Sequence, residues 1–259
     1  MTTIEWTDKT WNPTTGCDQV SPGCDHCYAL TLAKRLKAMG SPKYQADGNP
    51  ATSGPGFALT VHPDTIDLPH TWKHPQHIFV TSMSDLFHPA VPEPFIDQIY
   101  ETMALTPRHT YQILTKRPHR LQSYLRRRPV LPNVWLGVSI ENDRYQFRAH
   151  YLRHTPAAVR FLSCEPLLGP LPDLNLEGID WVIVGGESGP GARPMDINWV
   201  REIRDRCIDT RTAFFFKQWG RWAPTTTPDG YAIRRGGNHA SGRTLDGRTW
   251  DQYPETAPA

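Results

Sequence analysis

The chain has 259 residues, of which 38% are hydrophobic and 21% are charged, and its formal net charge is +2 at pH 7. This composition predicts a soluble globular protein with one large domain or two small ones, and it excludes a protein whose overall charge marks it as a nucleic-acid binder. No apolar run approaches the length of a membrane span and the N-terminus is polar, so we expect no membrane segment, no signal peptide and a cytoplasmic location. In that compartment the five cysteines are expected to be thiols or metal ligands.

Short apolar runs predict a series of strands, and helical patterns lie between several of them. In chain order, strands are expected at Phe57–Val61, His77–Ser82, Tyr111–Thr115, Val134–Ile140, Arg160–Ser163, Trp181–Val184 and Ala213–Phe216, with an additional first strand near Ile4–Thr7. Helices are expected at Tyr28–Met39, Glu93–Leu105, Pro118–Arg128, Asp143–Arg153 and Asn198–Ile208. The connections 64–75 and 167–179 are too short for a full helix.

Nearly continuous apolar runs are typical of strands that are buried on both faces, as in a parallel sheet. The alternation of strands and helices therefore predicts an α/β fold, a (β/α) barrel or partial barrel of parallel strands, with an open doubly wound sheet as the alternative. We expect residues 1–220 to form this single domain. Residues 221–259 are rich in Gly, Pro and Arg, and they predict an extended C-terminal segment that packs on the domain, with a small hairpin.

Three cysteines lie within eleven residues: Cys17, Cys24 and Cys27. Such spacing is typical of a metal site, and two interpretations are open. One is a structural zinc site, for which His26, Cys164 or a distant histidine would supply the fourth ligand. The other is a [4Fe–4S] cluster that has three cysteine ligands and one iron left open for a small molecule. The predicted helix that follows Cys27 points its N-terminus at the site, which favours thiolates.

Polar residues follow six consecutive predicted strands. In a parallel barrel these strand ends meet on one face, so the pattern predicts a polar cavity there. For any single carboxylate, the alternative is a helix cap or an ion pair with Lys116, Arg117 or Lys217. The residues are Ser82, Ser84, Asp85 and His88; Thr115, Lys116 and Arg117; Ser139, Glu141 and Asn142; Ser163, Cys164 and Glu165; Gly185, Gly186, Glu187 and Ser188; and Lys217 and Gln218.

Two further patterns each have an ordinary explanation. The glycine-rich turn 185–191 could bring backbone N–H groups close to an anion, but it matches no nucleotide-binding motif, and a tight turn is the alternative. The arginines between Arg117 and Arg128 could contact phosphates, but an exposed helix face is the simpler interpretation.

The segments WNPTTGC, SPGCDHCYA, FVTSMSDLFH, ILTKRP, VWLGVSIEN, FLSCEPLLGP, WVIVGGESGPGARP, FFKQWG and LDGRTW follow one another from Trp11 to about Trp250. In this order they resemble a phage-related bacterial family of unknown function with a three-cysteine motif, which is similar to the radical S-adenosylmethionine (SAM) enzymes. Those enzymes have three residues between the first two cysteines, where this chain has six. The two residues between the second and third cysteines match, as does the aromatic residue Tyr28.

The resemblance implies that Cys17, Cys24 and Cys27 each bind one iron of a [4Fe–4S] cluster, and that the fourth iron binds SAM. Cleavage of SAM would give a 5′-deoxyadenosyl radical that takes a hydrogen atom from the substrate. Catalytic candidates are Cys164, Glu165 and Lys116. Candidates for cofactor contacts are Tyr28, Ser82, Ser139, Glu141, Asn142, Gly185, Gly186 and Glu187. The element Gly185-Gly186-Glu187 resembles the one that contacts the SAM amino group, although here it follows a late strand.

Cys164 could be a hydrogen donor or thiyl relay, a fourth cluster ligand, or a small buried residue, which is the commonest fate of a lone cysteine. Basic and aromatic residues make a nucleic acid or nucleotide a conceivable substrate, although core tryptophans explain them more simply. Two other functions are open. One is a zinc- or cluster-stapled protein that binds nucleic acid or a partner without radical chemistry. The other is a metal-dependent hydrolase or nuclease that uses Asp85, His88 and the glutamates.

Overall fold

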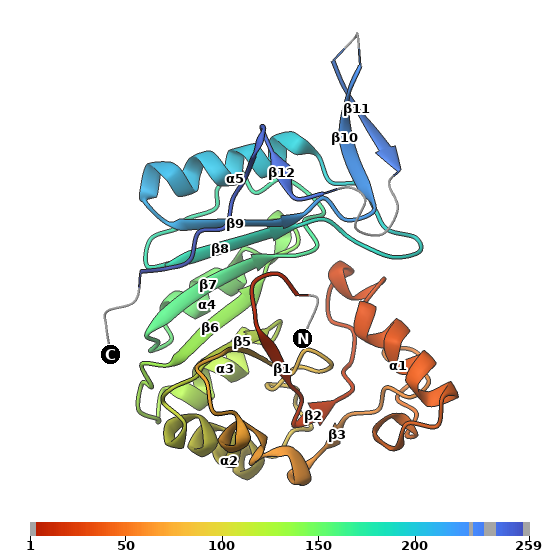
Figure 1. The fold of residues 1–259 in the computed structure, drawn as a ribbon, viewed down its shortest axis with the longest axis vertical. Helices are drawn as coiled ribbons and strands as arrows, with labels where there is room; N and C mark the ends of the chain where they lie inside the picture. Colours follow the sequence, from red (N-terminus) through yellow and green to blue (C-terminus); the bar gives the residue numbers. More distant parts are fainter. Residues whose placement is uncertain (1–3, 228–229, 236–241, 256–259) are drawn as a thin grey trace. The chain divides into compact units, whose positions relative to one another are not determined.

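The computed structural model describes residues 4–227, 230–235 and 242–255. Its main sheet is parallel and has seven strands in the order β1-β4-β5-β6-β7-β8-β9. Helices lie between most of these strands in the chain, which is the topology of a partial (β/α) barrel and confirms the predicted fold class (Figure 1). The strands are β1 (Lys9–Trp11), β4 (His77–Val80), β5 (Thr110–Thr115), β6 (Val134–Ser139), β7 (Val159–Cys164), β8 (Trp181–Gly185) and β9 (Ala213–Gln218).

The chain divides into two compact units. Unit 1 comprises Met1–Gly137 and His154–Ala158, and unit 2 comprises Val138–Arg153 and Val159–Ala259. In the described part of the chain, no helix is long and apolar enough to cross a membrane.

Unit 1 contains β1, β4 and β5, helices α1 (Tyr28–Ala38), α2 (Glu93–Leu105) and α3 (Pro118–Leu125), and a short antiparallel pair of β2 (Thr14–Thr15) with β3 (Thr60–Val61). The register of the parallel strands places Trp11 beside Val80, and both side chains are fully buried. A separate small core under α1 contains Ala29, Ala33 and Met83, and the thiols of Cys17 and Cys27 pack against it.

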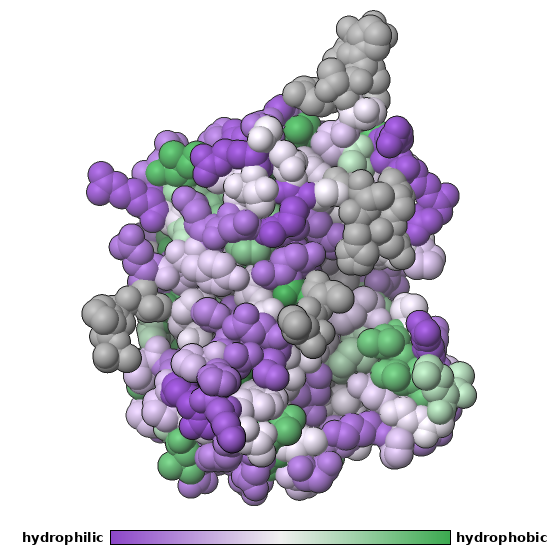
Figure 2. All heavy atoms as spheres, in the orientation of Figure 1, coloured by the Kyte–Doolittle hydropathy of each residue, from purple (hydrophilic) through white to green (hydrophobic). Residues whose placement is uncertain are grey.

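The outward face of α1 is partly apolar. Tyr28 is 53% exposed, Leu32 is 38% exposed and Met39, just beyond the helix, is 70% exposed. Figure 2 shows apolar residues gathered over this helix, while hydrophilic residues cover much of the remaining surface of unit 1 in this view.

Unit 2 contains α4 (Phe147–Arg153), strands β7, β8 and β9, and α5 (Ile197–Thr210), which packs along β9 (Figure 1). Strands β10 (Trp222–Thr227) and β11 (Gly230–Arg235) pair as an antiparallel hairpin that projects from this unit, and β12 (Thr244–Leu245) pairs with β13 (Arg248–Thr249). The core of the unit is aromatic. The Trp181 and Tyr253 rings stack with centroids 5.0 Å apart, and Trp250 meets Phe214 edge-on at 5.6 Å.

These contacts involve part of the C-terminal segment predicted at 221–259, and the backbone N–H of Phe216 in β9 also donates to Trp250 O at 2.9 Å. Residues 228–229, 236–241 and 256–259 of that segment lie outside the described residues.

Six predicted strands and five predicted helices correspond to elements of the structure, with small shifts of their ends, and the two connections at 64–75 and 167–179 contain no α-helix. The expected strand Phe57–Val61 is wrong as a member of the main sheet. Only Thr60–Val61 is extended, as β3, because Phe57 is buried in the small core under α1 and leaves the run too short.

Two further boundaries differ from the prediction. The first strand is β1 at Lys9–Trp11 and not near Ile4–Thr7, because the indole of Trp11, which donates from Nε1 to Thr65 O at 2.8 Å, is buried there against the rest of unit 1. The helix expected at Asp143–Arg153 begins only at Phe147. Asn142 Oδ1 accepts a hydrogen bond from Arg144 N at 3.2 Å and thereby caps a separate 3-10 turn.

Candidate functional site

The loop that carries the three cysteines is fixed to the segment after β4. The backbone N–H of Gly16 donates to Met83 O at 3.0 Å, and Ser84 Oγ donates to Gly16 O at 2.6 Å. Gly16 has φ +85°, and a Cβ atom at this position would lie 2.1 Å from Ala58 O. Only glycine therefore fits before Cys17, and the first thiol has a defined position at the carboxyl end of the strands of unit 1.

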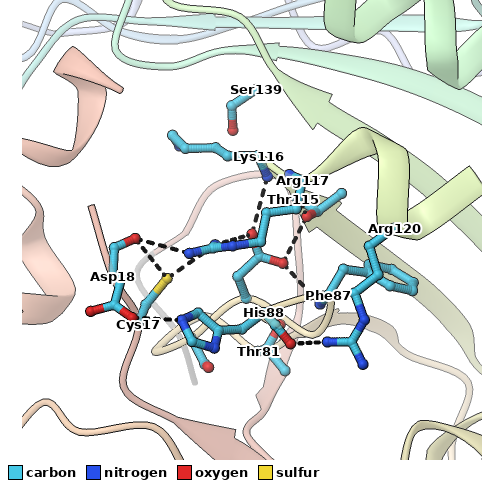
Figure 3. Close-up of polar contacts among 12 residues, drawn as sticks. Cys17, Asp18, Thr81, Phe87, His88, Thr115, Lys116, Arg117, Arg120 and Ser139 are labelled. Atoms are coloured by element: carbon cyan, nitrogen blue, oxygen red, sulfur yellow. Dashed lines mark hydrogen bonds and ion pairs between the residues drawn. The ribbon is translucent and has the colours of Figure 1, made fainter. Parts of the chain in front are cut away.

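Arg117, the second residue after β5, connects this loop to the sheet (Figure 3). Its Nη1 donates to Cys17 Sγ at 3.4 Å and to Asp85 Oδ2 at 2.8 Å, and its Nη2 donates to Asp18 O at 3.0 Å. The pKa of Cys17 is raised to about 12, mainly because the thiol is buried; the charge of Asp85 contributes to the rise, and Arg117 opposes it. Without a metal, Cys17 is thus a protonated thiol at neutral pH, and a bound metal must displace its proton.

Cys27 lies at the N-cap position of α1. Burial raises its pKa, and this effect is opposed by the backbone N–H groups of Leu30 and Ala29 and by the charge of Lys116. The helix N-terminus thus favours the thiolate form over what burial alone would allow. Two neighbouring cations at the end of β5 therefore act on two different thiols of the loop, Arg117 on Cys17 and Lys116 on Cys27.

Cys24 ends a 3-10 turn at Pro22–Cys24, and its Sγ lies 4.0 Å from Ser21 Oγ. A negative charge on Cys24 would act on both Cys17 and Cys27, so the three thiols are electrostatic neighbours. In the described ranges, no group of three or more His, Cys, Asp or Glu side chains is placed to hold one metal ion. A [4Fe–4S] cluster instead takes one thiolate on each of three irons, and three adjacent thiols beside two cations fit such an anionic group.

Two predicted cofactor contacts, Tyr28 and Ser82, are bonded to each other. Tyr28 Oη donates to Ser82 O at 2.5 Å. Asn12, which the sequence analysis did not single out, holds the same segment: its Nδ2 donates to Ser82 Oγ at 3.1 Å and its Oδ1 accepts from Met83 N at 3.0 Å. The WNP segment before the cysteines was the available signal for this residue.

Asp85, a candidate metal ligand in the hydrolase alternative, is buried, and both oxygens of its carboxylate accept hydrogen bonds from the protein. Its Oδ1 accepts hydrogen bonds from Phe87 N at 2.9 Å and Thr115 Oγ1 at 2.7 Å. Its Oδ2 accepts from Lys116 N at 3.2 Å and Arg117 Nη1 at 2.8 Å. Four donors leave this carboxylate little capacity to coordinate a metal ion, so its contacts favour a role in orienting Arg117.

His88, the other hydrolase candidate, also has a partner at each ring nitrogen. Its Nδ1 accepts from Ala90 N at 3.2 Å, which places the ring proton on Nε2, and Nε2 lies 2.9 Å from Asp18 Oδ2. Burial lowers the pKa of His88, and the hydrogen bond to Asp18 opposes this shift. The histidine thus joins the segment after β4 to the cysteine loop.

In unit 2 the three candidate carboxylates each have a cationic partner. Glu165 bonds to Lys217, one of the three cations named in the ion-pair alternative, whereas Glu141 and Glu187 bond to arginines that were not among them. Burial of a carboxylate without such a partner would be costly. The pairs are Glu141 with Arg148 at 2.9 Å, Glu165 with Lys217 at 3.0 Å, and Glu187 with Arg193 at 2.6 Å.

Other predicted residues of unit 2 also have internal contacts. Ser139 O accepts from Arg148 Nη1 at 2.8 Å, and Ser163 Oγ donates to Glu165 Oε2 at 3.2 Å. Cys164, at the end of β7, is completely buried. Burial raises its pKa well above the ordinary value, with a further contribution from Cys207, which is also completely buried in α5.

The glycine-rich turn after β8 has a packing reason. A Cβ at Gly186 would lie 2.0 Å from Trp219 O, and the backbone N–H of Gly186 donates to Gln218 O at 2.9 Å. A Cβ at Gly185 would lie 2.9 Å from Glu165 Oε1. Close approach of the backbone at Trp219 therefore accounts for Gly186, and the nearby side chain of Glu165 for Gly185, which corresponds to the tight-turn alternative.

The arginine-rich segment of α3 makes contacts within unit 1. Arg120 donates to His88 O and Val91 O, and Arg128 Nε donates to Asp97 Oδ1 at 2.8 Å. Arg126 Nη2 donates to Gln122 Oε1 at 3.0 Å. These contacts favour a structural role for the segment over a phosphate-binding patch.

Residues 1–254 match the family described as "Protein of unknown function (DUF5131)". No curated protein matches the chain. Among solved structures, spore photoproduct lyase complexed with dinucleoside spore photoproduct is 13% identical, with a TM-score of 0.42, and the match covers 87% of this chain and 68% of that chain.

A spore photoproduct lyase variant with dinucleoside spore photoproduct is 14% identical, with a TM-score of 0.43, and the match covers 87% of this chain and 68% of that one. Another variant, with bound AdoMet and dinucleoside spore photoproduct, is 12% identical, with a TM-score of 0.39. This match covers 85% of this chain and 66% of that chain.

Proposed function

We propose that this chain, which belongs to the family described as "Protein of unknown function (DUF5131)", is an iron–sulfur enzyme of the radical-SAM kind. The proposal is drawn from the residues of the chain itself. Cys17, Cys24 and Cys27 would hold a [4Fe–4S] cluster whose fourth iron is open to SAM. Such a cluster supplies one-electron reductive cleavage of SAM when it is bound.

The observation that supports this proposal is the environment of the three thiols. They share one loop, two of them face cations from the end of β5, and Cys27 lies at the N-terminus of α1. A purely structural zinc site would need a fourth ligand from the protein, whereas three thiolates leave one metal position open for a cofactor.

In this proposal, residues of unit 1 orient the cysteine thiols and hold the loop that carries them. Arg117 orients Cys17 and compensates its charge, while Cys17 and Cys27 must release their protons when the metal binds. Tyr28 and Ser82, joined by a hydrogen bond, fix the beginning of α1 against the segment after β4. The partly buried Cys17 and Cys27 pack against the small core under α1, which limits the access of water to the cluster ligands.

The other predicted site residues stay proposals. Cys164, Glu165 and Lys116 remain the candidate catalytic groups, and Ser139, Glu141, Asn142, Gly185, Gly186 and Glu187 the candidate SAM contacts. A ligand that approaches one of the three glutamates would have to compete with the basic residue already bonded to it. A nucleic acid or nucleotide remains the proposed substrate class, and the exposed Arg234 and Arg235 of the β10–β11 hairpin would contribute positive charge to its binding.

The test is anaerobic reconstitution of the full chain with iron and sulfide, followed by absorption and electron paramagnetic resonance spectra with and without SAM. We expect about four irons per chain and a reduced signal that changes when SAM is added. Cys17→Ala, Cys24→Ala and Cys27→Ala should each lose the cluster, while Cys207→Ala, which removes a buried thiol outside the loop, should retain it. A colourless wild-type protein that holds one zinc would overturn the proposal and favour a stapled binding protein.

A further inference from the structure

The end of β5 joins the cysteine loop to a buried carboxylate through one side chain. The guanidinium of Arg117 contacts Cys17 Sγ, Asp18 O and Asp85 Oδ2 at 3.4, 3.0 and 2.8 Å. The side chain of Arg117 is 11% exposed and that of Asp85 is 7% exposed. A nearly buried guanidinium needs a compensating charge, which Asp85 supplies, because an uncharged sulfur by itself offsets little of the cost of desolvating the cation.

Asp85 holds Arg117 in a single orientation. Its carboxylate also accepts from Phe87 N, Thr115 Oγ1 and Lys116 N, at 2.9, 2.7 and 3.2 Å, so it cannot rotate without breaking three other bonds. Thr115 Oγ1 in turn accepts from Arg117 N at 2.9 Å, which fixes the backbone from which the guanidinium extends. Such over-determined placement is what a group needs if it is to orient a metal ligand.

We propose that Arg117 is a positioning residue for the cluster: it orients Cys17, donates to its sulfur and stabilises the reduced cluster, while Asp85 fixes Arg117. The inference rests on the proposed function. Hydrogen bonds to ligand sulfurs and nearby charge set the potential of an iron–sulfur cluster, and reduction adds a negative charge that a fixed cation favours. Asp85 carries the opposite charge and therefore partly offsets this effect.

Opposite signs of the two charges provide the test. In the reconstituted full chain, Arg117→Gln should lower the reduction potential of the cluster, because it removes the cation. Asp85→Asn removes the negative charge and keeps one oxygen, which in the place of Oδ2 accepts from Lys116 N and Arg117 Nη1, while the bonds to Oδ1 are lost. Because Arg117 keeps its acceptor, the potential should rise. Arg117→Lys keeps the positive charge but cannot donate to Cys17, Asp85 and Asp18 at once. Its potential should therefore lie between those of the wild type and Arg117→Gln.

Iron retention gives a second readout. Loss of a group that orients a metal ligand weakens metal binding by about 10- to 100-fold, so Arg117→Gln should lose iron to a chelator faster by a similar factor. Arg127→Gln is the matched control, because it removes the same charge at an exposed position of the same arginine-rich segment. Its potential and iron loss should equal those of the wild type.

The outcomes separate the two proposals. Wild-type protein that takes up no cluster overturns the proposed function, and this inference with it. A loaded wild type whose potential is the same in Arg117→Gln and Asp85→Asn, or shifts in the same direction in both, overturns the inference alone. If Arg117→Gln does not fold, the shifts in Arg117→Lys and Asp85→Asn decide the question by the same criterion.

Discussion

The strand ends of unit 1 and those of unit 2 look alike in sequence but differ in what their polar side chains contact. After β4 and β5, Asp85 and Arg117 are organised around the thiol of Cys17. After β6, β7 and β8, three glutamates bond to basic side chains of their own unit. A carboxylate can be satisfied by an arginine or lysine of the same chain, whereas three adjacent thiols are best satisfied by a metal group. The chemistry of the partner, and not polarity alone, distinguishes a site from internal packing.

The largest expected effect is a loss of stability when the buried ion pair of Glu141 with Arg148 in unit 2 is broken. Glu141 is fully buried and pairs with Arg148, whose side chain is 2% exposed. Glu141→Gln leaves that arginine without a compensating charge, which should lower the free energy of unfolding by about 3–5 kcal/mol. Urea unfolding measures the loss. Iron content after reconstitution should not change in protein that remains folded; a loss of less than about 1 kcal/mol would contradict the structural role.

The second prediction concerns the cysteine loop. Gly16→Ala forces a residue with a Cβ atom to adopt φ +85°. The new Cβ would also lie 2.1 Å from Ala58 O. We expect a loss of about 3 kcal/mol in the free energy of unfolding, together with reduced iron uptake. Gly40→Ala is the control: Gly40 has φ +74° but nothing lies within 4 Å of its Cβ position, so about 1 kcal/mol should be lost. Equal losses in the two variants would show that the loop is not tightly held.

A smaller effect is expected at the beginning of α1. Tyr28→Phe removes the hydrogen bond from Tyr28 Oη to Ser82 O, which spans 2.5 Å. Because the tyrosine ring is half exposed and water can replace the lost partner, thermal unfolding should report a loss of at most about 1 kcal/mol. The cluster should still form, because no thiol is changed. A Tyr28→Phe protein without iron would instead assign this residue to cluster binding.

The smallest effect is a pH dependence in unit 2, far in sequence from the cysteines. The hydrogen bond from Arg201 lowers the pKa of Asp246 below its ordinary value; burial opposes this shift, and Arg204 adds to it. A carboxyl group whose pKa is lower in the folded state contributes stability above its unfolded pKa and loses it as pH falls through the folded value. Stability should therefore decline below about pH 4, by less than about 1 kcal/mol from this group. Unfolding curves of the wild type and Asp246→Asn should converge at low pH.

The predictable part of the fold came from strong local periodicity. The strands that became β8 and β9 are continuous apolar runs buried on both faces, and α5 has a clear amphipathic pattern. The run at 57–61 is also mostly apolar but lies in another environment, because Phe57 packs under α1. A five-residue pattern does not specify which neighbour will cover it.

The candidate site was predictable to a similar extent. The spacing of Cys17, Cys24 and Cys27 was sufficient to identify them as metal ligands to test. The sequence could also place Lys116 and Arg117 after a strand, since parallel strand ends meet at one edge. It did not indicate that Asn12 would hold the segment after β4 at Met83 N, because that contact joins residues far apart in the chain.

Taken by itself, the sequence determined the alternation of strands and helices, the parallel sheet and the cysteine loop, because each depends on local periodicity, spacing or residue chemistry. Only the tertiary structure decided the partners. It placed the guanidinium of Arg117 between Cys17 and Asp85, and it placed Arg193 on Glu187. Charge pairing depends on distances of a few ångströms between residues from different elements, and no pattern along one chain encodes those distances.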